Sequence, residues 1–259
     1  MDLGIRGRTA IVCASSQGLG KACAQALAEA GVSLTINGRN RTLLDQTAED
    51  IRRTTGVTVT PVAADVSTAE GQAALLAACP APDILINNNG GPPFSDFREL
   101  DRQALLTGVT MNMVTPIELI QKVIDGMAAR EFGRIVNITS ISVKMPLAGL
   151  DLSSGARAGL TAFVAGIART VAARNVTINS LLPGSFNTQR LRGGFAARSK
   201  KTGKPESEMV AQAIAEIPAR RFGTPAEFGQ MCAFLCSVHA SYMTGQNILL
   251  DGGAYPAAF

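Results

Sequence analysis

The sequence predicts a single α/β domain over residues 1–259, in which a doubly wound, seven-stranded parallel sheet is flanked by helices. Three observations predict this fold class. The chain has 259 residues, of which 46% are hydrophobic and 17% charged, enough to bury one large core. Short apolar runs alternate with longer helical patterns, as successive βαβ units require. A glycine-rich turn joins the first apolar run to the first helical pattern.

The strand candidates are short apolar runs, because strands buried on both faces lack alternation of polar and apolar residues. They lie at residues 9–13, 33–37, 58–62, 84–87, 134–138, 177–182 and 247–250. The predicted helices lie at 19–30, 41–54, 69–78, 102–130, 152–173 and 225–237. Residues 186–222 leave this alternation and are rich in Gly, Arg and Lys. They are too many for a turn, so we expect a lid or excursion with short helices of its own.

Composition argues against several classes of protein. The net charge of +4 comes without a dense basic stripe, so we expect no nucleic-acid partner. No uninterrupted apolar stretch is long enough to span a membrane, and the first residues lack the apolar run of a signal peptide. We therefore expect a cytoplasmic protein with no membrane partner. Cys232, Cys236 and His239 are too few to hold a metal, so we expect buried thiols and no metal site.

The first predicted strand runs into a glycine-rich turn, from Ala14 to Gly20, and then into a helix. At such a junction, backbone N–H groups and a helix N-terminus can face a pyrophosphate. Gly18 and Gly20 allow close approach of the backbone to a ligand and of the helix to the strand. A glycine turn alone is also compatible with a simple bend. In this context it favours a Rossmann-like dinucleotide site.

The end of the second predicted strand, at residues 36–40, indicates which dinucleotide is bound. It carries no acidic residue, which would bind the ribose hydroxyls of NAD. Asn37 and Arg39 instead suit a 2′-phosphate, which a guanidinium can hold through two parallel hydrogen bonds. The alternative interpretation of Arg39 is an exposed loop arginine. We predict NADP as the cofactor, with NAD as the alternative.

Further motifs follow later strands at regular positions. They are Asp65-Val66, Asn87-Asn88-Asn89-Gly90, Pro183-Gly184 with Thr188, Arg221 to Glu227, Tyr242 to Gln246 and Asp251-Gly252-Gly253. With the turn from Cys13 to Gly20, their order and spacing resemble the short-chain dehydrogenase/reductase family over nearly the whole chain. The pattern is close to that of 3-oxoacyl-carrier-protein reductases. Two residues depart from the family motifs: Ala14 replaces the first glycine of the turn, and Asn89 replaces the alanine of N-N-A-G.

The resemblance implies a set of cofactor contacts along the chain. They are Ala14, Ser15, Ser16, Gly18, Leu19, Gly20, Arg39, Asp65, Val66, Asn88, Gly90, Arg157, Pro183, Gly184 and Thr188.

The resemblance also implies four catalytic positions. In the family, an Asn anchors a water relay, a Ser steadies the substrate oxygen, a Tyr transfers the proton and a Lys supports the Tyr and the ribose. Asn112 and Ser140 match the first two, whereas Ser153 stands at the Tyr position and Arg157 at the Lys position. No tyrosine lies between Ser140 and residue 173, so no shift of register restores the pair.

These substitutions change the chemistry available. A serine hydroxyl is far less acidic than a phenol, and an arginine keeps the charge of a lysine without relaying protons. Ser153 could instead position a water or a substrate group. Lys144 could supply a proton if burial lowered its pKa, although a solvated loop lysine is the simpler interpretation. Asp151 lies beside these residues, and is more simply read as a helix N-cap.

The leading hypothesis is an NAD(P)-dependent oxidoreductase that acts on a carbonyl or alcohol with altered proton-transfer residues. A non-redox enzyme (lyase, isomerase or dehydratase) on the same fold and a non-catalytic cofactor-binding protein are the alternatives. We expect a small-molecule substrate; the basic residues of 186–222 are compatible with an anionic one, although a solvated, mobile loop is the simpler interpretation of them. The resemblance implies that helices 102–130 and 152–173 pair between subunits, giving a homo-oligomer, a dimer or tetramer.

Overall fold

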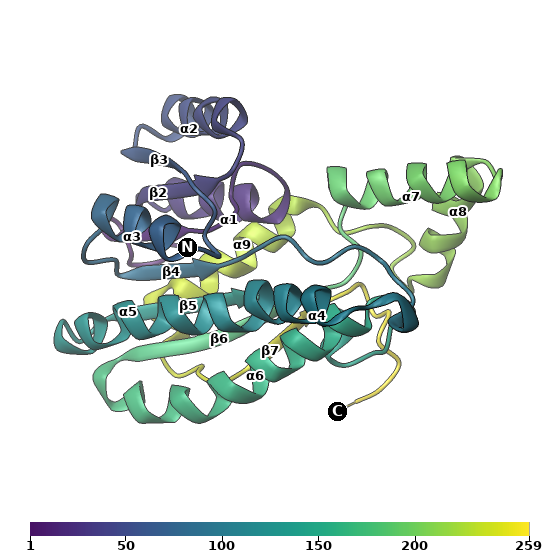
Figure 1. Ribbon diagram of the computed structural model, residues 1–259. Helices are drawn as coiled ribbons and strands as arrows, with labels where there is room; N and C mark the ends of the chain where they lie inside the picture. Colours follow the sequence, from purple (N-terminus) through teal and green to yellow (C-terminus); the bar gives the residue numbers. More distant parts are fainter. Residues whose placement is uncertain (259) are drawn as a thin grey trace.

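Seven parallel strands form one sheet in the computed structural model, which describes residues 1–258 (Figure 1). The spatial order is β3-β2-β1-β4-β5-β6-β7, so the chain starts in the centre and winds outward twice. The strands are β1 (Thr9–Val12), β2 (Ser33–Gly38), β3 (Val59–Ala63), β4 (Ile84–Asn87), β5 (Gly133–Ile138), β6 (Val176–Pro183) and β7 (Asn247–Leu250). This confirms the predicted fold class, and each strand end lies within one residue of its prediction.

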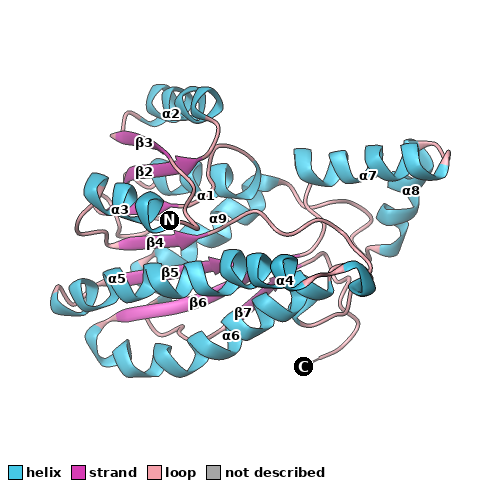
Figure 2. Cartoon of the chain, viewed as in Figure 1, coloured by secondary structure: helices cyan, strands magenta, loops and turns pink. Residues whose placement is uncertain are grey.

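Helices cover both faces of this sheet (Figure 2). They are α1 (Gly18–Glu29), α2 (Arg41–Thr55), α3 (Ala69–Ala78), α4 (Arg102–Val109), α5 (Thr115–Ala129), α6 (Asp151–Val171), α7 (Gln189–Thr202), α8 (Glu206–Glu216) and α9 (Pro225–Cys236). Successive side chains of a strand point to opposite faces. Val12 therefore packs with α1, α2 and α9, whereas Ile11 packs with α3, α5 and α6.

The helix predicted at residues 102–130 is not uniform. The segment Thr110–Val114 forms one turn of π-helix between α4 and α5. Such a turn inserts one extra residue into the helical ladder, and it often occurs at functional sites. Asn112 lies in the middle of this turn and is buried.

The excursion predicted at residues 186–222 contains α7 and α8, which project beyond the end of the sheet where the C-terminal tail also lies (Figure 1). Its two ends are pinned together, because Phe186 pairs with Gly223 in an isolated parallel bridge. The Phe186 ring also packs edge-on against Phe228 of α9, at 5.2 Å between centroids. The excursion therefore starts and ends at one fixed point of the core.

All five cysteines are buried free thiols, as predicted. None of the helices within residues 1–258 combines the length and apolarity needed to cross a membrane.

Candidate functional site

The turn after β1 is shaped by its glycines. Gly18 has a φ of +61°, which favours glycine, and a Cβ on Gly20 would lie 2.3 Å from the Ala14 carbonyl oxygen. Ala14 itself has a φ of +44°, although it carries a Cβ. Its carbonyl oxygen accepts a hydrogen bond from Asn88 Nδ2 at 3.1 Å. The backbone therefore forms the close cradle that a pyrophosphate requires, with some strain at Ala14.

Asn37 does not face a 2′-phosphate, so this part of the sequence interpretation is wrong. The residue is buried, and its Nδ2 donates to the carbonyl oxygens of Val62 and Ala64, at 3.1 and 3.0 Å. Its Oδ1 accepts from the backbone N–H of Ala14 at 3.3 Å. Asn37 therefore ties the ends of three strands together, because their carboxyl ends meet at this edge.

Arg39 and Asp65 form the adenosine end of the candidate site. The Arg39 side chain is 74% exposed, and its Nη1 lies 3.9 Å from Asp65 Oδ2. Hydrogen bonding from Ser67 lowers the pKa of Asp65, and the charge of Arg39 adds to this effect. Val66 is buried beside them. A guanidinium held this loosely is free to turn toward a phosphate.

The opposite end of the site lies where β6 meets the lid. A Cβ on Gly184 would lie 2.8 Å from Asp251 Cα, so glycine lets the C-terminal tail pass beside it. Thr188 caps α7 by accepting from the N–H of Leu191 at 3.3 Å. A Cβ on Gly18 would lie 3.9 Å from Thr188 Cγ2, so the start of α7 returns to the pyrophosphate turn.

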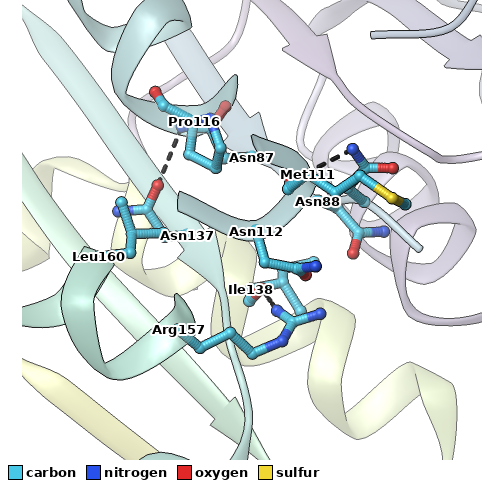
Figure 3. A pocket seen from close by; sticks show the side chains of 10 residues that line it. Asn87, Asn88, Met111, Asn112, Pro116, Asn137, Ile138, Arg157 and Leu160 are labelled. Carbon is cyan, nitrogen blue, oxygen red and sulfur yellow. Dashed lines mark hydrogen bonds between the residues drawn. The ribbon is translucent and has the colours of Figure 1, made fainter. Parts of the chain in front are cut away.

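A small cavity of about 10 Å³ lies between α5, α6 and the ends of β4 and β5 (Figure 3). It has room for about one water molecule. Its lining residues are Asn87, Asn88, Asn89, Met111, Asn112, Pro116, Asn137, Ile138, Arg157 and Leu160. Three buried amide atoms of this lining have no hydrogen-bond partner within the described residues, Asn87 Oδ1, Asn112 Oδ1 and Asn137 Nδ2. Such atoms favour a bound water.

Ser153 and Arg157 lie one turn apart on α6, and both are buried. Arg157 Nε donates to Ser153 Oγ at 3.2 Å, and Nη1 donates to the carbonyl oxygen of Ile138 at 2.8 Å. Burial and, to a smaller extent, the nearby charge of Arg190 lower the pKa of the Arg157 guanidinium to about 10. Figure 3 shows the Asn112 amide and the Arg157 guanidinium beside the same space.

Ser140 follows β5, as predicted. Its Oγ accepts from the N–H of Ser142 at 3.1 Å, which leaves the hydroxyl hydrogen available to donate to a substrate oxygen. Lys144 is exposed on the same loop, with its Nζ 5.5 Å from the centroid of the Tyr255 ring. The sequence gives no signal for this contact, because Tyr255 lies in the C-terminal tail.

Two details of the sequence interpretation need revision. Asp151 is the first residue of α6 and forms no cap; the N-cap position is Leu150. Asn89, where the family has alanine, ties its loop to the π turn: its Nδ2 donates to the Met111 carbonyl oxygen at 3.3 Å. The extra amide thus supports the wall of the cavity.

Comparison with known proteins agrees with this geometry. Residues 13–255 match the family model described as Enoyl-(acyl carrier protein) reductase. The chain is 34% identical to the NADPH-dependent reductase BacG of Bacillus subtilis, over 95% of this chain and 97% of that protein. It is 30% identical to the 3-oxoacyl-[acyl-carrier-protein] reductase FabG of Vibrio cholerae, over 98% and 99%.

Solved structures give the same result. The crystal structure of YwfH, an NADPH dependent reductase involved in bacilysin biosynthesis, has a TM-score of 0.90 at 33% identity and covers 96% of this chain and 99% of its own. L-Sorbose reductase from Gluconobacter frateurii, complexed with NADPH and L-sorbose, has a TM-score of 0.94 at 28% identity, with coverages of 99% and 100%. The chain therefore belongs to the matched family, within the short-chain dehydrogenase/reductase class of oxidoreductases.

Proposed function

We propose that this protein is an NADPH-dependent reductase of a small carbonyl compound, in which Ser153 and Arg157 replace the family's tyrosine and lysine. The observation that carries the proposal is that Asn112 and Arg157 line one water-sized cavity, while Arg157 also donates a hydrogen bond to Ser153. These residues come from α6 and the π turn, and a protein without a catalytic site would not need these polar groups in one place. BacG and L-sorbose reductase, which the chain resembles along its length, are both associated with NADPH.

The cofactor-binding residues fit this dinucleotide. The backbone between Ala14 and Gly20 would hold the pyrophosphate, because no Cβ can be accommodated at Gly20. Arg39 would hold the 2′-phosphate. Gly184 and Thr188 would flank the nicotinamide, which supplies a hydride when it is bound.

The chain's own polar groups would position the substrate. Ser140 would donate its hydroxyl hydrogen to the carbonyl oxygen, since its Oγ already accepts from Ser142. Arg157 would donate to the ribose hydroxyls through Nη2, which has no acceptor within residues 1–258. Asn112 would hold a water in the cavity through its unpartnered Oδ1.

The proton for the product would come from water rather than from a phenol. Arg157 keeps its proton near neutral pH, because its pKa is about 10. Ser153 Oγ accepts from Arg157 Nε, so its own hydrogen can be passed to the substrate oxygen and replaced from the cavity water. Lys144 is the other candidate donor, from the rim of the site.

The test is NADPH oxidation by the purified protein with a panel of ketones and β-keto esters. Ser140→Ala should lower kcat by at least about 100-fold, since it removes a donor to the developing negative charge. NADPH binding, measured by calorimetry, should be unchanged. Ser154→Ala is the control, because Ser154 Oγ only donates to the Leu150 carbonyl oxygen within its own helix. No oxidation with any carbonyl, while NADPH binds, would refute the proposal.

A non-redox reaction is the second candidate, because α6 carries no tyrosine. Turnover of a substrate without change in nicotinamide absorbance would establish it. A non-catalytic binding protein would instead tolerate Ser140→Ala without any cellular phenotype.

A homo-oligomer, a dimer or tetramer, is part of the proposal. Leu105, Leu106, Val114 and Phe163 are exposed on helices α4 and α6 and on the π turn between α4 and α5. Exposed apolar side chains on elements that contact one another support an association surface. Light scattering tests this.

We also propose a cytoplasmic location, which is supported by five unpaired cysteines, since disulfides are rare in reducing compartments.

A further inference from the structure

A second arginine lies close to the candidate active site. Arg190 stands in the first turn of α7, and its guanidinium lies against the backbone at Gly91. A Cβ on Gly91 would be 2.7 Å from Arg190 Nη2 and 3.3 Å from Nη1. Gly91 follows directly after the Asn87–Gly90 loop, which lines the cavity beside Arg157. The lid therefore places a cation at the mouth of the site.

Neither arginine has an acidic partner within residues 1–258. Arg157 donates only to neutral oxygens, those of Ser153 and Ile138. Arg190 forms no hydrogen bond or ion pair with the described residues. The charge of Arg190 also contributes to the lowered pKa of Arg157, so the two cations are close enough to repel each other. Like charges held together in this way are stabilised when an anion lies between them.

We propose that Arg157 and Arg190 bind the carboxylate of the substrate, so that the protein reduces a 2-oxo or 3-oxo acid. This inference rests on the proposed reductase activity. A carboxylate is planar and can accept two parallel hydrogen bonds from the Arg190 guanidinium. Arg157 already donates through Nε and Nη1 to Ser153 and Ile138, so it attracts the carboxylate through its charge. Arg157 Nε donates to Ser153 Oγ at 3.2 Å, so a carboxylate attracted to Arg157 lies on the side of the site that holds Ser153.

The cofactor's own phosphates are a less suitable occupant of this pair. The pyrophosphate cradle lies at the turn before α1, and Arg39 provides the cation for the 2′-phosphate. The ribose hydroxyls that Arg157 would also contact are neutral, so they leave both positive charges uncompensated. Arg192, on the same helix, is held differently, because its Nε donates to Asn187 Oδ1 at 2.8 Å.

The experiment compares a 2-oxo acid with its neutral ethyl ester in Arg190→Gln and in a matched control, Arg192→Gln. Both arginines are exposed on α7, so neither change should disturb folding. Arg190→Gln should lower kcat/KM for the acid by about 10- to 100-fold, the range for a hydrogen bond between charged groups. Values for the ester, the Kd of NADPH and the control should stay within about twofold. Arg190→Lys should recover part of the loss.

Equal losses for acid and ester, or weaker NADPH binding in Arg190→Gln, would overturn the proposal and assign Arg190 to the cofactor. Calorimetric titration with oxamate, in the presence of NADP, separates this outcome from failure of the reductase activity, because it requires no turnover. Oxamate should bind the unmodified protein and bind Arg190→Gln at least about 10-fold more weakly. Equal affinity for both proteins would refute the carboxylate site even if carbonyl reduction is observed.

Discussion

Replacing Arg157 by methionine should make the protein more stable and less active. Burial lowers the pKa of Arg157 to about 10, well below the value of an exposed arginine. At about 1.4 kcal/mol per pKa unit, the buried charge destabilises the fold by about 3 kcal/mol. Because the pKa is lowered, this destabilisation is fully present below about pH 10 and is relieved only as the pH rises above it.

Part of this gain is offset in Arg157→Met. The Ile138 carbonyl oxygen loses its donor, and the Ser153 hydroxyl loses one partner, at about 1 kcal/mol each. Methionine fills a similar volume and buries apolar surface instead. The net stabilisation is about 1 to 2 kcal/mol, which raises Tm by about 2 to 4 °C for each kcal/mol in a chain of this size. Meanwhile kcat/KM should fall by at least about 100-fold.

Arg134→Met is the matched control, because Arg134 is also a buried arginine. Unlike Arg157, it has its donors satisfied by the carbonyl oxygens of Ser237, Gly133 and Asn175. Its removal leaves several buried carbonyl groups unpaired, so we expect a loss of about 3 kcal/mol or more. Thermal unfolding near neutral pH measures both variants. A lower Tm for Arg157→Met would refute the conclusion that the buried charge of Arg157 destabilises the fold.

Three further predictions concern the cofactor cradle and the lid hinge. Ala14→Gly relieves about 1 kcal/mol of backbone strain at a φ of +44°. It also raises the conformational entropy of the unfolded chain, which offsets the gain by a similar free energy, so the free energy of unfolding in urea should change by less than about 0.5 kcal/mol. A larger loss of stability would contradict this prediction. Arg39→Ala should weaken NADPH binding about 10- to 100-fold and leave the affinity for NADH unchanged, both measured by calorimetry. Equal effects on the two cofactors would show that Arg39 does not hold the 2′-phosphate. Hydrogen bonding from Arg221 and Thr224 lowers the pKa of Glu227 to about 2. Glu227→Gln should therefore have a lower Tm than the unmodified protein above about pH 4 and the same Tm near pH 2. A difference in Tm that does not depend on pH would exclude an ionic cause.

The sheet could be predicted from the sequence because burial on both faces leaves a local signature. Runs such as Ile84 to Asn87 are apolar throughout and short, so few other structures accommodate them. The glycine turn is equally local, since Gly20 must lack a Cβ within the same βα unit. The positions of Ser140, Ser153 and Arg157 were predicted from the family resemblance, and their catalytic roles stay predictions.

Contacts between distant segments could not be predicted in the same way. Asn37 and Arg39 are both polar residues near the end of one strand, yet only Arg39 faces solvent, because Asn37 satisfies carbonyl groups of β3 and the following loop. Nothing near Arg190 in the sequence indicates that its guanidinium meets Gly91, a hundred residues earlier. The π turn around Asn112 also has no periodic signature, since it differs from an α-helix by one residue.

In the family, the tyrosine–lysine pair supplies both a proton and a positive charge, whereas Ser153 and Arg157 stand at these positions here. Arg157 can supply charge, but with a pKa of about 10 it neither gains nor loses a proton near neutrality, and a serine hydroxyl does not titrate there. If water supplies the proton, kcat should be nearly independent of pH from about 6 to 9, as measured in steady-state assays. A bend in that range would instead identify a titrating donor. Lys144→Met should leave kcat within about twofold, because Lys144 lies exposed on the rim beside Tyr255; a large loss would identify Lys144 as the donor.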